Sequence, residues 1–359
     1  MIFEIPQAIR ETLDRNRERI QAISNKIKNK HRFYFTGCGT AYFAAMLGSQ
    51  LLSLGENAGI QSISVPALEF INYGYPVDAE SVTLGISHSG ITKTTVDALH
   101  HAKAKGAFSI GITHFQNRPI SQAAHETLIA GNSLDKSRCH TKCYVAGATV
   151  CGLVAVDLLR GRSKTTSKRA QEIEDRLNEL PRMTEQALRT TDDICERLAE
   201  KHVTKNRFYF AGTGPNVPNT HEAALKFMET SYILAQGFET EQLLHGPWVS
   251  LDENSVVVAL APGSSGHQRH VDLVKAARTV GASVISIVDQ GDQAVRSISD
   301  DAIELPSVDE YLSPFINIIP LYLFAYYSCV KRGLNPDHLR YPTPKYWQAR
   351  NIIFPPGTH

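Results

Sequence analysis

Residues 32–40 read Arg-Phe-Tyr-Phe-Thr-Gly-Cys-Gly-Thr, an apolar run that stops at Gly-x-Gly. The same pattern returns 175 positions later, where residues 207–215 read Arg-Phe-Tyr-Phe-Ala-Gly-Thr-Gly-Pro. A second pair of segments, 105–112 and 280–287, has the same offset, and a third pair, 81–84 and 255–258, differs by one position. A nearly constant offset across three separate segments predicts two copies of one fold.

Each copy alternates strand-like apolar runs with helix-like runs. After the first strands, we expect helices at 42–54 and 222–234, strands at 82–86 and 256–260, helices at 94–105 and 270–280, and strands at 109–113 and 283–288. Strands that alternate with helices predict an α/β fold in which a mostly parallel sheet is flanked by helices on both faces, a flavodoxin-like αβα arrangement. We therefore expect an N-terminal helix (1–30), a first α/β domain (31–165), a helical connector (166–200), a second α/β domain (201–337) and a C-terminal tail that closes the site (338–359).

The composition excludes several classes of protein. The 359 residues carry a net charge of +1, so bulk charge does not indicate nucleic-acid binding. The basic run 160–169 lacks interleaved aromatic side chains, and a solvated connector explains it better. No signal-peptide pattern opens the chain, and the apolar run 315–330 is short and contains Asn317 and Pro320, so we expect a buried helix and no membrane span. Six scattered cysteines suit free thiols in a cytoplasmic protein.

A cluster of short hydroxyl side chains follows the strand expected at 82–86. Residues Ser87–Thr92, which we call the hydroxyl loop, read Ser-His-Ser-Gly-Ile-Thr and precede an expected helix. The carboxyl end of a parallel strand is where ligands bind in such sheets, and a helix N-terminus favours an anion. An ordinary N-cap and turn is the alternative. The second copy reads Ala-Pro-Gly-Ser-Ser-Gly at 261–266 and lacks this order, so we expect one anion site per chain.

Several motifs together resemble the sugar isomerase (SIS) family, with two SIS domains. These motifs are Glu4–Ile9, Gly37–Thr40, Glu69–Phe70, the hydroxyl loop, Ala224–Ile233, His245–Pro247 and Pro320–Tyr326. The chain most resembles the isomerase half of glucosamine-6-phosphate synthase and stand-alone phosphosugar isomerases, deaminases and deglycases. The chain shows no glutaminase domain and does not open with Met-Cys, so we expect that glutamine supplies no ammonia within it.

The resemblance implies roles for individual residues. Ser87, Ser89 and Thr92 would hold a sugar phosphate, helped by Gly39 and Thr40, and His88 lies within the same loop. Glu229 would shuttle a proton between C1 and C2, and Lys226 matches the lysine three positions before that glutamate. His245 would open the sugar ring and would arrive from the partner subunit of a homodimer. Lys345 matches, more loosely, the lysine that meets the open-chain carbonyl.

The residues themselves fit this chemistry, although simpler explanations exist. A single carboxylate can remove and return a proton beside a carbonyl, and Lys226 and Glu229 share one face of a helix because they are three positions apart. A surface ion pair is the simpler explanation for the two residues. A buried, hydrogen-bonded histidine is the simpler explanation for His245, and a lysine reaching for water is the simpler one for Lys345.

Departures from the family pattern leave the substrate open. Ala41 stands where a serine is usual, and Arg138 and His140 bring basic side chains toward the sugar. We therefore keep open isomerisation of a phosphorylated hexose at C1 and C2, deamination of an amino-sugar phosphate, deglycation of a fructosamine phosphate, and isomerisation of a sulfonated hexose. A sugar-phosphate sensor without catalysis is the remaining alternative. It would need an output domain, which the single helical pattern at 7–28 does not provide.

The pattern Cys139-His140-x-x-Cys143 resembles half of a zinc site. A structural zinc ion usually takes four ligands, and the sequence shows no second pair of suitable spacing. We therefore expect neither metal nor cofactor.

Overall fold

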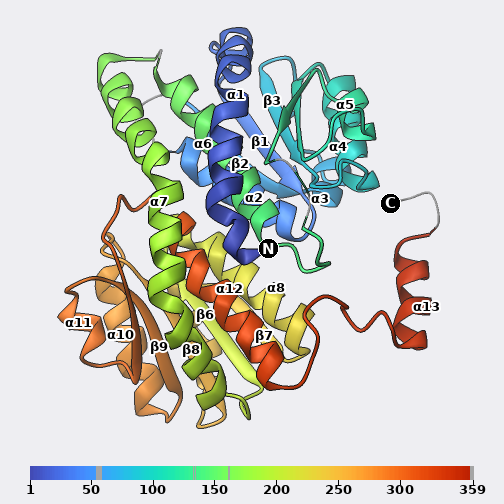
Figure 1. Ribbon diagram of the computed structural model, residues 1–359. Helices are drawn as coiled ribbons and strands as arrows, with labels where there is room; N and C mark the ends of the chain where they lie inside the picture. The colour runs from blue at the N-terminus through green and yellow to red at the C-terminus, as the bar shows by residue number, and fades with distance from the viewer. Residues whose placement is uncertain (54–58, 132, 134, 161, 356–359) are drawn as a thin grey trace. The chain divides into compact units, whose positions relative to one another are not determined.

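The computed structural model describes residues 1–53, 59–131, 133, 135–160 and 162–355 and divides into two compact units (Figure 1). Unit 1 comprises Met1, Phe3–Pro181 and Arg340–His359, and unit 2 comprises Ile2 and Arg182–Leu339. Each unit contains a five-stranded sheet in which every strand pair is parallel. The predicted fold of two tandem α/β domains is confirmed.

The sheet of unit 1 has the strand order β2-β1-β3-β4-β5. All six residues of its central strand β3 are buried, as expected for a strand whose sheet is covered by helices on both faces. The bounds are β1 (Arg32–Gly37), β2 (Gln61–Pro66), β3 (Ser81–Ile86), β4 (Phe108–Thr113) and β5 (Glu126–Ile129).

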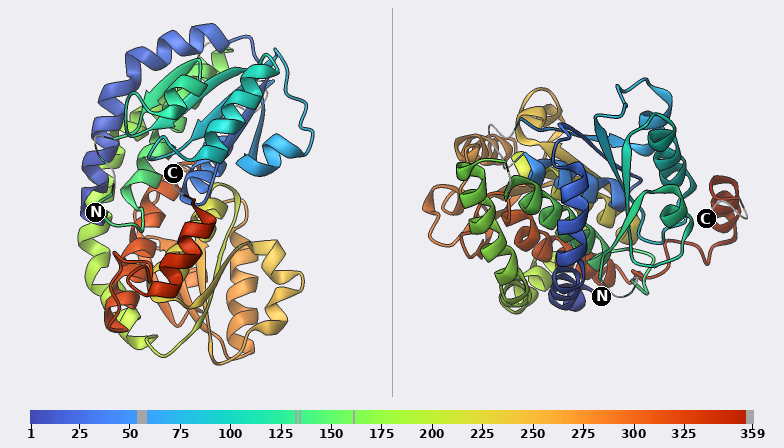
Figure 2. Two further views of the ribbon diagram at one scale, coloured as in Figure 1. Left: turned by 90° about the vertical axis from the view of Figure 1, so that its right-hand side faces the viewer. Right: turned by 90° about the horizontal axis from the view of Figure 1, so that it is seen from above.

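Helices cover both faces of this sheet (Figures 1 and 2). On one face α6 packs against both α1 and α2, and on the other α4 packs against α3 and α5. Helix α6 is apolar on nearly every side and is buried over most of its length. The bounds are α1 (Ile5–Ile27), α2 (Thr40–Leu52), α3 (Ala67–Asn72), α4 (Lys93–Ala104), α5 (Pro119–Ala123), α6 (Lys142–Arg160) and α13 (Pro344–Ile353), with a 3-10 turn at Ile2–Glu4.

Unit 2 repeats the arrangement with the strand order β10-β9-β8-β6-β7. Helices α8 and α12 pack against each other, while α10 covers β8 and β9 together with α9 and α11. The strands are β6 (Arg207–Gly212), β7 (Leu234–Glu239), β8 (Ser255–Ala261), β9 (Ser283–Asp289) and β10 (Asp301–Leu305). The helices are α8 (Val217–Ser231), α9 (Thr240–Leu244), α10 (His267–Thr279), α11 (Gln293–Arg296) and α12 (Ser313–Lys331), with 3-10 turns at Gly214–Asn216 and Pro247–Ser250.

One long helix, α7 (Lys164–Lys201), occupies the predicted connector at 166–200. It belongs to unit 1 up to Pro181 and to unit 2 from Arg182. The C-terminal tail predicted at 338–359 contains α13, which buries none of its residues. Residues 356–359 of that tail lie outside the described residues.

Several element bounds differ from the sequence prediction by a few residues; the helix expected at 222–234, for example, begins at Val217. The helix expected at 222–234 ends at Ser231, because Tyr232 adopts a left-handed conformation (φ 58°) and Leu234 opens β7. The helix expected at 42–54 ends at Leu52, and Leu54 lies outside the described residues.

Helices α6 and α12 are long and apolar enough to cross a membrane by length and composition alone. In this structure 94% of the apolar window of α6 and 83% of that of α12 are buried. The apolar run at 315–330 is therefore a buried core helix of unit 2, as the sequence indicated.

Candidate functional site in two groups of residues

The hydroxyl loop leaves the carboxyl end of β3 and is fastened to the neighbouring strand β4. The main-chain N–H of Ser87 donates to the carbonyl of Ile112 (3.0 Å), and that of His114 donates to the carbonyl of His88 (3.1 Å). The Thr113 hydroxyl also donates to the His88 carbonyl (3.2 Å). These bonds fix the loop at the carboxyl edge of the sheet, where parallel α/β folds bind ligands.

Within the loop, the Ser87 hydroxyl is an internal brace. It donates to Thr92 Oγ1 (3.0 Å) and accepts from the main-chain N–H groups of Gly90 (3.1 Å) and Thr92 (3.4 Å). Ser87 is 1% exposed, whereas Ser89 and Thr92 are half-buried. Helix α4 begins one residue later at Lys93, so its positive N-terminal end adjoins the two more accessible hydroxyls.

Gly90 gives the loop its shape. Its φ of +73° lies in the left-handed region that favours glycine. A Cβ atom there would lie 2.7 Å from the Cβ of Arg118 and 2.8 Å from Thr113 Oγ1. Glycine therefore lets the loop pack closely against the segment that follows β4.

The Gly39–Thr40 turn follows β1, the strand next to the one that leads into the hydroxyl loop. Strands β1 and β3 are parallel neighbours, so their carboxyl ends meet at one edge of the sheet. The Cys38 sulfur lies 3.8 Å from Thr95 Oγ1 in the first turn of α4. Gly39 is exposed and Thr40 opens α2.

The remaining predicted binding residues of unit 1 lie in three different settings. His88 is 7% exposed, and its ring centroid lies 5.6 Å from that of His114 and 5.7 Å from that of His140. Arg138 is exposed and its guanidinium lies over the Tyr341 ring (5.4 Å). Lys345, on α13, lies over the ring of Tyr346 (5.4 Å), and no residue of that helix is buried.

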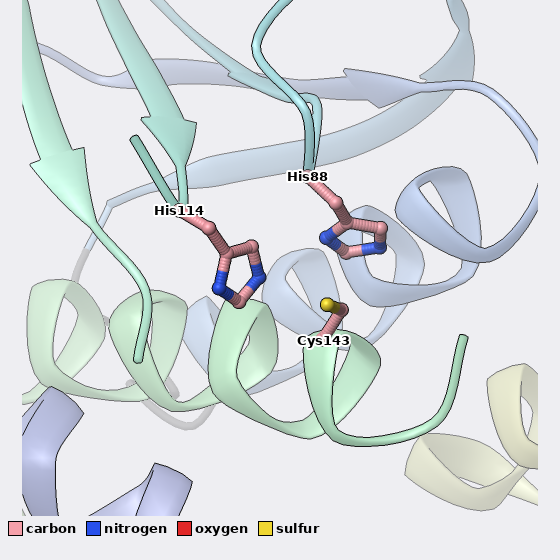
Figure 3. A group of neighbouring side chains, drawn as sticks. All are labelled: His88, His114 and Cys143. Atoms are coloured by element: carbon pink, nitrogen blue, oxygen red, sulfur yellow. The ribbon is translucent and has the colours of Figure 1, made fainter. Parts of the chain in front are cut away.

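His88 faces inward toward His114 and Cys143 (Figure 3). Burial lowers the pKa of His114 to about 4 and raises the pKa of the Cys143 thiol well above its usual range. Burial would also raise the pKa of Asp135, but the His140 and Cys143 side chains and the Thr141 N–H outweigh it and hold that pKa below its usual range.

In unit 2, Lys226 is buried between two carboxylates of helix α8. Its Nζ lies 2.8 Å from Glu229 Oε2 and 3.4 Å from Glu222 Oε1, and its side chain is 2% exposed. The Tyr322 hydroxyl donates to Glu222 Oε1 (3.0 Å). The side chain of Glu229 is 24% exposed and that of Glu222 is fully buried. A surface ion pair is therefore the wrong explanation for Lys226, because the helix places it against the core.

His245 follows α9 and is exposed, so a buried histidine is the wrong explanation here too. Its side chain is 73% exposed, and its Nδ1 lies 2.9 Å from the main-chain oxygen of Glu241 and 3.2 Å from Oε2 of the same residue. Glu241 is held in turn by Arg269 (3.0 Å from Nη2 to Oε2). If Nδ1 donates to the Glu241 carbonyl, Nε2 is the ring nitrogen that can accept a proton.

The predicted site residues thus fall into two groups. The hydroxyl loop, Gly39–Thr40, Arg138, His140 and Lys345 belong to unit 1, and Lys226, Glu229 and His245 belong to unit 2.

The second copy of the loop is organised differently. The main-chain N–H of Gly263 donates to Asp289 Oδ2 (3.1 Å), and Ser307 donates to the same oxygen (2.9 Å). A carboxylate of the protein itself therefore takes the place where an anion would bind. This arrangement supports the expectation of one anion site per chain.

Sequence reasoning missed His114 and Glu222. His114 is separated by 26 positions from His88 and by 29 from Cys143, and only the adjacency of β3 and β4 brings the residues together. Glu222 lies four positions before Lys226 on α8, so helical spacing could have revealed it.

Comparison with known proteins agrees with this geometry. The model of the SIS domain matches residues 26–151 and 203–332. The glutamine–fructose-6-phosphate aminotransferases (isomerizing) of Thermococcus kodakarensis and Aquifex aeolicus are each 32% identical to the chain, over 341 and 339 residues. The matches cover 94% of this chain but 56% and 55% of those proteins, so the chain spans a little over half their length.

Two solved structures share the fold. The C-terminal domain of glucosamine-fructose-6-phosphate aminotransferase from Francisella tularensis has a TM-score of 0.85 at 22% identity, covering 94% of this chain and 96% of that one. Glucosamine-6-phosphate deaminase from Thermotoga maritima has a TM-score of 0.68 at 19% identity, covering 92% of this chain and 96% of that one.

Proposed function

We propose that this chain, which belongs to the SIS domain family, is an enzyme that interconverts the aldose and ketose forms of a phosphorylated hexose at C1 and C2. The observation that carries the proposal is the hydroxyl loop. It is fixed at the carboxyl edge of a parallel sheet and followed directly by the N-terminus of α4. Ser89, Thr92 and the helix N-terminus offer hydroxyl and N–H donors to a phosphate.

The residues of unit 2 supply the acid–base chemistry in this proposal. Glu229 is the carboxylate that removes a proton from the carbon beside the carbonyl and returns it to the neighbouring carbon. Lys226 acts through Glu229, because it is buried and lies 2.8 Å from that carboxylate, so we assign it a positioning role. His245, through Nε2, moves the proton that ring opening requires, and Lys345 meets the open-chain carbonyl.

Assembly is part of the same proposal. We expect a cytoplasmic homodimer in which His245 completes the site of the partner subunit. The strong exposure of His245 (73%) and of α13 supports this arrangement, because both offer surface that a second copy could cover. If sedimentation analysis showed that the fully active protein is a monomer, the proposed homodimer would be contradicted.

The deaminase, the deglycase and the isomerase of a sulfonated hexose share the first steps and differ in the substrate. The matched test is a panel of hexose 6-phosphates, amino-sugar phosphates, fructosamine phosphates and a sulfonated hexose, with ketose, ammonia and amino acid measured separately. We expect ketose formation from a hexose phosphate. Ammonia release, amino-acid release or preference for the sulfonate would move the proposal to the corresponding alternative.

Exchange of Glu229 for glutamine separates an enzyme from a sensor. Glu229→Gln should lower kcat by at least 10²-fold because the general base is lost, while the ligand should still raise Tm. Glu185→Gln, which alters an exposed ion pair with Arg189 on α7, is the control and should keep full activity. Ligand-induced stabilisation of the wild type without turnover on any member of the panel would identify a sensor.

A further inference from the structure

Three buried side chains from separate elements converge behind the hydroxyl loop (Figure 3). They are His88 in the loop, His114 directly after β4, and Cys143 in the first turn of α6, and we call them the His–Cys cluster. One ligand atom from each lies within 4.8 Å of the others. The residues are 7%, 4% and 0% exposed, respectively.

His114 has polar groups that the described part of the chain does not satisfy. Neither of its ring nitrogens makes a hydrogen bond of good geometry with the described residues, although the main chain of Cys143 lies close enough to raise the pKa of His114 slightly against the effect of burial. A buried polar atom without a partner costs free energy, and such atoms are uncommon in folded proteins. A metal ion that accepts an electron pair from one imidazole nitrogen of His114 would remove this cost for that nitrogen.

The donor set favours one metal over the others. Two imidazoles and a thiolate suit zinc, which binds nitrogen at roughly 2.0 Å and sulfur at roughly 2.3 Å. Tetrahedral geometry would place the ligand atoms roughly 3.3–3.6 Å apart. The cluster therefore needs to contract by about 1 Å from its widest separation around the ion.

A fourth ligand is at hand in the loop before α6. Asp135, His140 and Cys143 form a second group whose ligand atoms lie within 4.8 Å of one another. His140 Nδ1 lies 3.7 Å from Asp135 Oδ2, too far for a hydrogen bond but close enough that a modest turn of the ring would let the carboxylate orient the histidine through this nitrogen. The His140 side chain is 33% exposed, which gives its ring room to turn toward the cluster.

We propose that His88, His114, Cys143 and His140 bind one structural zinc ion, which fastens the hydroxyl loop to β4 and α6. We expected no metal from the sequence because a zinc site is recognised there by pairs of ligands with short spacing. Most of the ligands proposed here come instead from segments of unit 1 that are far apart in the sequence. The site is specific to this copy of the repeat. At the offset of 175, Asp289 stands in place of His114, and the second loop carries no histidine within 261–266.

The test uses the full-length chain and the metals themselves. Protein purified without added metal is dialysed, and its zinc is counted by mass spectrometry. The chelated protein is then titrated with Zn²⁺ and Co²⁺. We expect one tightly held zinc per chain, a rise in Tm on zinc addition, and a Co²⁺ spectrum with tetrahedral d–d bands and a sulfur-to-metal charge-transfer band.

Variants locate the ion. Cys143→Ser should abolish the charge-transfer band and weaken zinc binding by at least 10²-fold, and His114→Gln and His140→Gln should each weaken binding by at least 10-fold. Cys151→Ser, a buried cysteine farther along α6, and His202→Gln, a buried histidine of unit 2, are the controls and should keep one zinc per chain.

The inference does not rest on the proposed reaction, because metal content and spectra are read without substrate. Zinc well below one per chain after dialysis, together with no Co²⁺ charge-transfer band in the wild type, would overturn it. A Cys143→Ser protein that keeps wild-type zinc affinity would also overturn it and would identify an adventitious ion. If Cys143→Ser fails to fold, the wild-type stoichiometry and the partly exposed His140→Gln decide the question.

Discussion

Lys226 is a buried charge of unit 2, because its side chain is 2% exposed, and two carboxylates lie within 3.4 Å of it. Lys226→Met should lower the free energy of unfolding by about 3–5 kcal/mol, since Glu222 stays buried without that cation. Urea denaturation followed by circular dichroism measures this loss. Lys168→Met, which removes a lysine whose side chain is 84% exposed beside Glu172, should cost under about 1 kcal/mol. If both variants lost the same unfolding free energy, burial of Lys226 and Glu222 would not be the source of the predicted effect.

His270 makes stability depend on pH. Burial, reinforced by the charge of His267, lowers the pKa of His270 to about 4, whereas an unfolded histidine has a pKa near 6.5. The unfolded state therefore binds more protons between these values, so stability is fully present above about pH 6.5 and is lost as pH falls toward 4. His270→Gln should flatten the curve of unfolding free energy against pH by up to about 1.4 kcal/mol per pH unit in this window. Parallel curves for wild type and His270→Gln would contradict this, and His100→Gln on the surface of α4 is the control.

At the scale of elements, the turn from β3 to α4 depends on close packing as well as on a left-handed glycine. Gly90 and Gly39 both have positive φ, but a Cβ atom at Gly90 would clash with Arg118 and Thr113, whereas none would meet an atom within 4 Å at Gly39. Gly90→Ala should therefore destabilise the protein through steric overlap as well as backbone strain, whereas Gly39→Ala should cost only the strain of its backbone conformation (φ 55°, ψ −132°), on the order of 1–3 kcal/mol. Thermal unfolding of the two variants compares them directly. Similar Tm values would mean that the loop relaxes without cost.

The central strands and the long helices α1, α7 and α12 could be predicted from sequence because they are strongly apolar or strongly periodic, whereas the long helix α6 was not predicted. Strand β3 is buried throughout, and the amphipathic α4 starts within one residue of its predicted position. The outer strands β2, β5, β7 and β10 were missed, because an edge strand is covered on fewer sides and its pattern is mixed. In β7, for example, exposed Leu234 and Gln236 alternate with buried Ala235 and Gly237. Such a segment does not stand out from a loop by hydrophobicity.

The hydroxyl loop could be predicted because its residues are contiguous and follow a strand. The buried state of Lys226 and the His–Cys cluster could not, since each depends on which side chains the fold brings together. Residues 88, 114 and 143 lie far apart in the sequence. They are brought together only because β3 and β4 are neighbouring strands and α6 packs beside them. Local sequence patterns therefore predict the position of the loop but do not predict which buried side chains pack against it.

Across the whole molecule, duplication has been followed by specialisation of the two copies. The sheets have the same connectivity, yet the loop after β3 presents hydroxyls while the loop after β8 directs a main-chain N–H to Asp289. A carboxylate in that position repels an incoming anion and already occupies a donor. In the proposed reaction, the unit with the hydroxyl loop would hold the phosphate, and the other unit would supply the carboxylate and histidine for proton transfer.

This division predicts the stoichiometry of anion binding. Titration of the full chain with a hexose 6-phosphate by calorimetry should give one site per chain. Ser89→Ala combined with Thr92→Ala should weaken that site by at least 10-fold, because two hydroxyl donors to the phosphate are lost. The matching double change in unit 2, Ser264→Ala with Ser265→Ala, should leave affinity unchanged, since Asp289 already fills that loop. Two equivalent sites per chain, or equal effects of the two double variants, would show that both copies bind anions and that the repeat has not specialised.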